Sequence, residues 1–159
     1  MQLIPLGSEA IINKGFSHKI ILDYADVAAG GAATTTTKQI FPEGTGTFAA
    51  GLAVLRCAAK LVTAFDFSDA GITSLTLEVG DGTDPNRFLD SMELAVDGTE
   101  VLYKIGAVAT SPYAYLVADG IDALFTVANG GSPLVNECTS GKVEIYLLLS
   151  DLSDMTKPQ

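Results

Sequence analysis

Few residues of this chain have the types and spacing that chemistry requires. The sequence contains one histidine, His18, so it cannot form a metal site that needs two or three histidines. A catalytic triad would need a nucleophile, this same histidine and an orienting carboxylate, and the nucleophile-elbow pattern Gly-x-Ser-x-Gly does not occur. We therefore expect no enzyme and no catalytic residues, and we interpret His18 as an ordinary surface or hinge residue.

The acidic loop from Gly80 to Arg87 is the most distinctive local feature. Asp81, Asp84 and Asn86 could give oxygen ligands to Ca²⁺, but the loop lacks the Asp-x-Asp-x-Asp-Gly spacing and a following glutamate. The alternative is a turn held by its own Asp and Asn side chains, followed by a short helix from Asn86 to Ser91. We favour the turn and expect no cofactor.

The charge balance argues against several classes of partner. Nine basic and 19 acidic residues give a net charge of −10, which repels nucleic acid and anionic lipid headgroups. The longest apolar run, Phe48 to Leu55, is far short of the about 20 residues that a membrane span needs. The first residues lack the pattern of a signal peptide, so we expect synthesis in a reducing cytoplasm.

The two cysteines, Cys57 and Cys138, are far apart in sequence. In a reducing compartment we expect both to be buried thiols that behave as small apolar side chains. A disulfide between them would require the two strands that carry them to face each other.

Alternation with a period of two dominates the chain and predicts half-buried strands. The clearest cases are Thr73 to Val79, and Lys142 to Leu149 with Gly141 marking its start. Further strands are predicted at Lys19–Tyr24, Thr34–Phe41, Val101–Ile105, Ala114–Ala118 and Ala123–Ala128. Turns are predicted at Asp97-Gly98, Asn129-Gly130-Gly131 and Ser140-Gly141. Short strands and frequent turns favour an all-β sandwich or barrel with at most one or two short helices.

One segment, Ala53 to Phe67, fits two patterns. Its alanines favour a helix, whereas its β-branched and aromatic end favours a strand. We assign a strand at least from Ala58 onward.

The ends of the chain differ from the middle. We divide it into an N-terminal arm (1–18), a β-sandwich domain (19–152) and a polar tail (153–159). The arm could be a poorly ordered terminus or an edge strand. It could also pack on a neighbouring protein subunit through its apolar residues, which are Leu3, Ile4, Leu6, Ile11 and Ile12.

Three consecutive segments carry a resemblance to a known group. Val62–Asp66, Thr73–Gly82 and Asp84–Leu89 resemble a pattern in small virion proteins of tailed bacteriophages, where a strand ending in an aromatic–Asp pair precedes a strand and an acidic loop. The closing strand Gly141–Leu147 also fits. Capsid decoration (cement) proteins of this group are similar in size and acidity, and the resemblance implies an antiparallel, jelly-roll-like β-sandwich. It transfers no functional residue.

Two functions follow from these expectations. The first is a decoration protein that binds the outer capsid surface between major capsid subunits, forms a homo-oligomer (a trimer is favoured) and stabilises the shell. Its location would be the virion, after synthesis in the host cytoplasm. The alternative is an adhesion or receptor-binding module associated with a phage tail or fibre.

Overall fold

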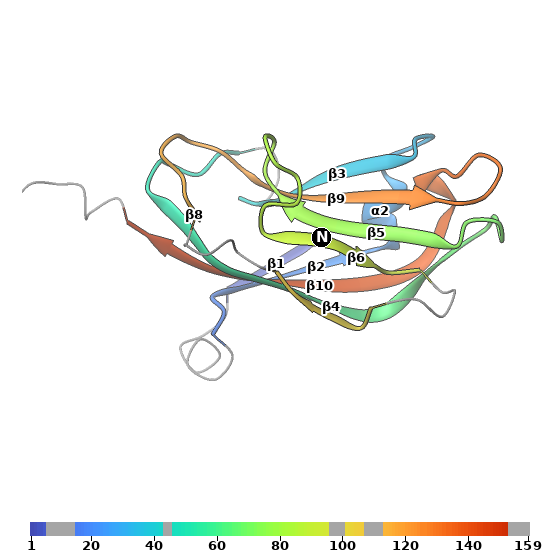
Figure 1. Cartoon of the computed structure of the whole chain (residues 1–159), viewed down its shortest axis with the longest axis horizontal. Helices are drawn as coiled ribbons and strands as arrows, with labels where there is room; N and C mark the ends of the chain where they lie inside the picture. Colours follow the sequence, from blue (N-terminus) through green and yellow to red (C-terminus); the bar gives the residue numbers. More distant parts are fainter. Residues whose placement is uncertain (6–14, 43–45, 96–100, 107–112, 153–159) are drawn as a thin grey trace, which may run out of the picture.

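The chain folds into two antiparallel β-sheets, shown in Figure 1 by a computed structural model that describes residues 1–5, 15–42, 46–95, 101–106 and 113–152. The strands are β1 (Gln2–Pro5), β2 (His18–Asp23), β3 (Thr35–Phe41), β4 (Leu52–Phe67), β5 (Ser74–Gly80), β6 (Leu89–Glu93), β7 (Tyr103–Ile105), β8 (Tyr113–Ala114), β9 (Ile121–Ala128) and β10 (Cys138–Asp151). Two short helices are α2 (Tyr24–Ala28) and the 3₁₀ helix η1 (Val135–Glu137). Among the described residues, no helix is long and apolar enough to span a membrane.

The strand order is that of a jelly roll. One sheet has the order β1-β2-β10-β4-β7, with β8 also paired to β4, and the other has the order β3-β9-β5-β6. Successive strands cross between the sheets from β2 to β5, and the chain crosses again from β6 to β7, from β8 to β9 and from β9 to β10. When β1 and β8 are set aside, the two four-stranded sets are β2-β10-β4-β7 and β3-β9-β5-β6, which is the strand order of a jelly roll. The predicted all-β, antiparallel, jelly-roll-like sandwich is therefore confirmed.

The core lies between the sheets and is filled by the inward residues of each strand. In β9, the alternation of buried and half-buried positions runs from Ile121 to Val127 without interruption. Phe65 from one sheet and Phe125 from the other are both fully buried, with ring centroids 6.4 Å apart. Burial of a large apolar side chain contributes about 1.5–3 kcal/mol, so the inward rows of the two sheets hold the layers together.

The ambiguous segment is one long central strand. β4 runs from Leu52 to Phe67 and pairs with β10 along one side and with β7 and β8 along the other. Pairing on both sides satisfies its backbone groups in the sheet, which overrides the helical preference of its alanines. The strand assignment from Ala58 onward is correct, and the strand begins six residues earlier.

The short helix predicted from Asn86 to Ser91 is wrong. These residues form a turn and then enter β6, which begins at Leu89. The amide of Phe88 donates to the carbonyl of Val79 (2.8 Å), and Leu89 lies opposite Val79 in the ladder with β5. The backbone groups that would form hydrogen bonds within a helix therefore pair with β5 instead.

Two further expectations need correction. Of the predicted strand Ala114–Ala118, only Ala114 lies in β8 (Tyr113–Ala114), and Leu116 is 89% exposed. Gly141 does not start the last strand. β10 begins at Cys138, and register shifts on both sides of Gly141 mark a bulge within the ladder to β4. The predicted turn at Asp97-Gly98 lies outside the described residues.

Candidate functional site

The loop after β5 is organised around one buried carboxylate, Asp81, which is 3% exposed. Its Oδ1 accepts hydrogen bonds from the amides of Thr83 (3.0 Å) and Asp84 (2.9 Å). Its Oδ2 accepts from Nε of Arg87 (2.6 Å) and from the hydroxyl of Tyr115 (3.1 Å). Four donors from the protein therefore surround this side chain.

The groups around Asp81 form a closed polar and aromatic cluster. The Arg87 guanidinium lies 4.1 Å from the ring centroid of Tyr113, which packs edge-on against Tyr115 at 4.8 Å. Burial alone would raise the pKa of Asp81, but the hydrogen bonds from Asp84, Arg87, Thr83 and Tyr115 outweigh it and lower that pKa. Burial, and next the negative charge of Asp81, raise the pKa of Tyr115. The cluster thus holds an ionised aspartate beside a neutral tyrosine.

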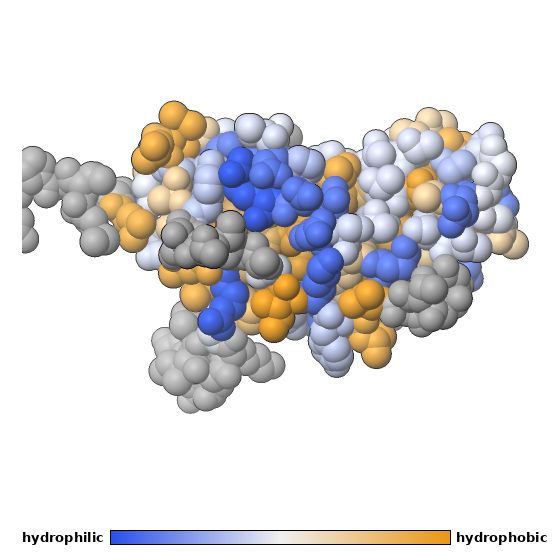
Figure 2. Space-filling view, in the orientation of Figure 1, coloured by the Kyte–Doolittle hydropathy of each residue, from blue (hydrophilic) through white to orange (hydrophobic). Residues whose placement is uncertain are grey.

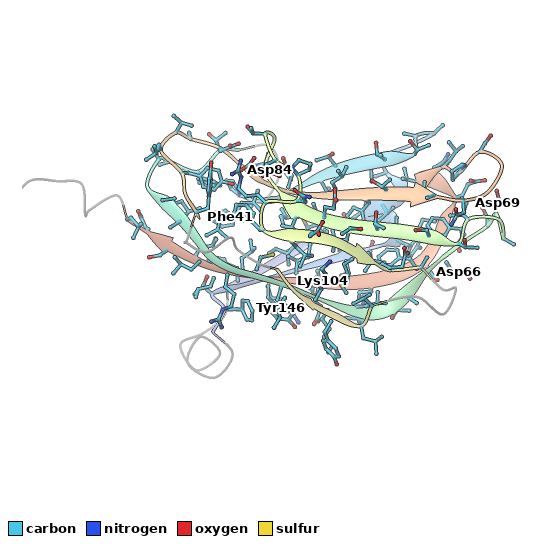
Figure 3. All side chains as sticks on the ribbon, viewed as in Figure 1. Phe41, Asp66, Asp69, Asp84, Lys104 and Tyr146 are labelled. Atoms are coloured by element: carbon cyan, nitrogen blue, oxygen red, sulfur yellow. The ribbon has the colours of Figure 1, made fainter. Side chains whose placement is uncertain are left out.

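This geometry gives Asp81 a structural role that competes with cation binding. Arg87 forms an ion pair with Oδ2 of Asp81 (2.6 Å), so a positive charge already lies against the carboxylate that Ca²⁺ would need. Asp84 and Asn86, the other two calcium candidates, lie on the solvent side of the loop, where Figure 3 labels Asp84. Among the described residues, no three His, Cys, Asp and Glu side chains are grouped so that they could hold a metal ion.

His18 contacts Ser17, but the hydroxyl of Ser17 is also hydrogen-bonded to the backbone of β10. Nδ1 of His18 lies 2.9 Å from Oγ of Ser17, a contact of the kind that serves nucleophilic catalysis elsewhere. Here the same oxygen donates to the carbonyl of Leu147 (3.1 Å) and accepts from the amide of Leu149 (2.9 Å). Ser17 therefore ties the start of β2 to β10, and burial lowers the pKa of His18, whose ring packs on Phe41.

The two cysteines lie on adjacent strands but far apart. Cys138 is opposite Phe67 in the ladder between β10 and β4, ten positions along β4 from Cys57. At about 3.3 Å per residue the separation is about 33 Å, well beyond disulfide reach. Both are buried as free thiols, as the sequence predicted.

Neither thiol should react in the native protein. Burial raises the pKa of the Cys57 thiol, and burial raises that of Cys138 to about 12, so the reactive thiolate is scarce at pH 8. We expect dithionitrobenzoate to label both cysteines quickly in guanidinium chloride but at least about 100-fold more slowly in buffer. The variant Ser132→Cys, which adds an exposed cysteine, is the control for access of the reagent. Rapid labelling of the unmodified protein in buffer would contradict the burial of Cys57 and Cys138.

The five residues predicted to make subunit or capsid contacts are only partly described. Leu3 and Ile4 lie in β1, where they are opposite Ile20 and Lys19 of β2, at the edge of the sheet. Leu6, Ile11 and Ile12 lie outside the described residues. The edge strand that was one alternative for the arm is present within its first five residues. A contact of the arm with a neighbour stays a prediction.

A groove on the outer face of the β2-β10-β4-β7 sheet is the feature that sequence reasoning missed. Its floor is Ala58, which lies in register between Tyr146 on β10 and Ile105 on β7. Its volume is about 430 Å³, and the remaining lining residues are Phe16, Ala59, Lys60, Tyr103 and Lys104. In Figure 3 the side chain of Tyr146 lies below the ribbons of β10 and β4, away from the other sheet.

Exposed apolar side chains continue from the groove along β7. Tyr103 and Ile105 are 68% and 76% exposed, and Leu102 and Val62 are also exposed. We call these four residues the apolar strip. Figure 2 shows apolar surface along the lower edge of the view, beneath β10 and β4. Large exposed apolar side chains gathered on one face are typical of a site of interaction.

No family model and no curated protein matches this chain. Among solved structures, it is similar to a chain of the "Cyanophage Pam1 capsid asymmetric unit", with 18% identity over 82% of this chain and 80% of that one, at a TM-score of 0.48. It is also similar to a chain of the "Acidic stable capsid structure of Helicobacter pylori bacteriophage KHP30", with 14% identity over 83% and 99% and a TM-score of 0.37. At these scores neither structure assigns a function to this chain.

Proposed function

We propose that this chain is a structural protein of a phage virion and that it decorates the outer surface of the capsid. The observation that carries the proposal is the groove with its adjoining apolar strip, on one outer face of an otherwise acidic sandwich. The resemblance of Val62–Asp66 and of the loop after β5 to small virion proteins supports the same function. The Asp81 cluster serves this function indirectly, because it fixes the loop that leads into β6.

The fold suits a protein that works by adhesion alone. Two packed sheets with a filled core form a rigid body that needs little rearrangement on binding, which keeps the entropic cost of association low. A groove and a short apolar strip would give each copy only a modest interface. Many copies on one shell would together stabilise it, because each bound copy resists separation of the subunits beneath it.

Self-association belongs to the same proposal. We favour a homo-oligomer, with a trimer as the first candidate, seated where major capsid subunits meet. The arm of residues 1–18 is the candidate for contacts with a neighbouring copy, since β1 lies at the edge of its sheet. The virion is the proposed location of the assembled protein.

Co-sedimentation with shells tests the proposal. Purified full-length chain is mixed with expanded empty shells built from the major capsid protein encoded in the same genome. We expect saturable binding, with a fixed ratio of this chain to capsid subunits at the plateau, and a higher temperature of shell disruption. Unexpanded shells are the matched control for specificity. Binding to a glycan array without binding to shells would contradict decoration and favour the receptor-binding alternative.

A further inference from the structure

The two outer faces of the sandwich differ in charge. Strands β9, β5 and β6 carry four carboxylates and no lysine or arginine; the carboxylates are Glu78, Asp90, Glu93 and Asp122. β3, the remaining strand of that sheet, carries Lys38, which forms an ion pair with Asp26 of α2 (3.2 Å). That face is therefore acidic, in keeping with the net charge of the chain.

The face with the groove has the opposite character. Lys60 lines the groove, and Arg56 and Lys19 lie beside it on β4 and β2. The stem of Lys104 also lines the groove, but its ammonium donates to the carbonyl of Ser91 on β6. The carboxylate that lies among these basic residues is Glu144. It forms an ion pair with Lys19 (2.8 Å) and accepts a hydrogen bond from the hydroxyl of Tyr146 (2.5 Å). Three further carboxylates belong to strands of this sheet. Asp23 and Asp66 accept backbone hydrogen bonds at its far end, and Asp151 is the last residue of β10. Lys60 and Arg56 thus give the rim of the groove a positive charge in a protein whose net charge is −10.

Strand register builds both the walls and the charge of the groove. One row across the sheet runs Lys19, Tyr146, Ala58, Ile105, and the next runs Ile21, Glu144, Lys60, Tyr103. The small side chain of Ala58 leaves a depression between large neighbours on β10 and β7. Arg56 is held beside it, with its guanidinium 5.9 Å from the ring centroid of Phe16. At about 430 Å³ the groove falls within the range of binding pockets, about 300–1,000 Å³.

We propose, on the basis of the proposed function, that this face seats on the shell and that its groove receives an apolar side chain flanked by carboxylates on a capsid protein. Charge complementarity selects this occupant. An apolar side chain fills the space above Ala58, and acidic neighbours of that side chain meet the cations around the rim. The acidic face of β9, β5 and β6 then points away from the shell.

Two substitutions separate the apolar and the charged parts of the contact. Ala58→Leu fills the floor of the groove, and Lys60→Glu reverses a charge on its rim. The matched controls on the other sheet are Ala128→Leu, which adds the same side chain at an exposed position, and Thr35→Glu with Thr37→Glu, which changes the net charge by the same amount as Lys60→Glu. Shell affinity is measured by co-sedimentation with expanded shells.

We expect each groove variant to weaken shell binding at least about tenfold and both controls to stay within about twofold of the unmodified chain. Raising NaCl from about 50 to 500 mM should also weaken binding, although the protein is strongly acidic. If Ala58→Leu does not fold, as judged by circular dichroism, the double variant Tyr103→Ser with Ile105→Ser removes exposed groove residues instead.

The outcomes distinguish the two proposals. If the unmodified chain does not bind shells, decoration itself is wrong. If it binds and the groove variants bind as tightly as the controls, decoration stands and the assignment of this face is wrong. If Ala58→Leu loses self-association but still binds shells, a second copy of the chain occupies the groove. If the chain binds DNA in a salt-sensitive manner and the variants do not change shell binding, the cations bind phosphates. Either result would overturn the assignment of this face.

Discussion

Replacing Asp81 with alanine is expected to lower the free energy of unfolding by about 3–5 kcal/mol. The change removes the acceptor of two backbone amides and leaves Arg87 and the buried hydroxyl of Tyr115 without this partner. Donors left without an acceptor in a buried site keep their full desolvation cost. Urea unfolding followed by fluorescence or circular dichroism measures the loss.

A neighbouring carboxylate provides the control. Asp84 is 4.0 Å from Arg87 and its side chain is 43% exposed, so Asp84→Ala should cost less than about 1 kcal/mol. Asp81→Asn keeps an acceptor for the amides of Thr83 and Asp84 but loses the charge, and should fall between the two. Equal losses for Asp81→Ala and Asp84→Ala would show that the cluster does not depend on the buried aspartate.

The same carboxylate makes stability depend on pH. Because the folded protein lowers the pKa of Asp81, the unfolded chain binds its proton more readily. The contribution of Asp81 is therefore complete above the unfolded pKa of about 4 and is lost as pH falls through the lower folded value. The acid-induced drop in stability should be shallower in Asp81→Asn than in the unmodified protein.

Replacing Gly141 with alanine is expected to cost about 2–5 kcal/mol, from two separate causes. The residue has φ +132°, where a Cβ atom is strained, and that atom would lie 2.3 Å from Cγ of the fully buried Phe65 ring. Strained backbone costs about 1–3 kcal/mol and overpacking of a core costs a similar amount. Thermal and urea unfolding measure the total.

Two other glycines separate the causes. Gly31 has φ +73° with no atom within 4 Å of an added Cβ, so Gly31→Ala reports the backbone cost alone. Gly131 has neither a positive φ nor a close neighbour, so Gly131→Ala should be near neutral. A loss in Gly141→Ala no larger than that in Gly31→Ala would show that Phe65 moves aside without cost.

Local patterns predicted the parts of the fold that depend on one segment at a time. The alternation in Thr73–Val79 and Ala123–Ala128 gave β5 and β9 because each strand has one face in the core and one in solvent. The segment Ala53–Phe67 was ambiguous because neighbours buried both of its faces near Ala58. The helix expected at Asn86–Ser91 was wrong because pairing of Leu89 with Val79 is a long-range contact that no local preference reveals.

The groove could not be predicted for a similar reason. Its walls and floor come from segments that are far apart in sequence, and only the register of β10, β4 and β7 brings Tyr146, Ala58 and Ile105 into one row. The acidic loop was visible in the sequence, yet one of the four donors to Asp81, the hydroxyl of Tyr115, lies 34 residues away. The sequence did contain one signal, the shared side of Arg56 and Lys60, which is now the charged rim of the groove.

The bulge at Gly141 decides which half of β10 is inside and which is outside. Cys138 and Val143 both face the core although they are five positions apart, an odd number that strict alternation would place on opposite sides. The extra residue at the bulge therefore reverses which side chains of β10 after Gly141 face the core. Without the bulge, strict alternation from Cys138 would turn Tyr146 inward and Ile145 outward, so that the interior and the proposed docking face would trade side chains.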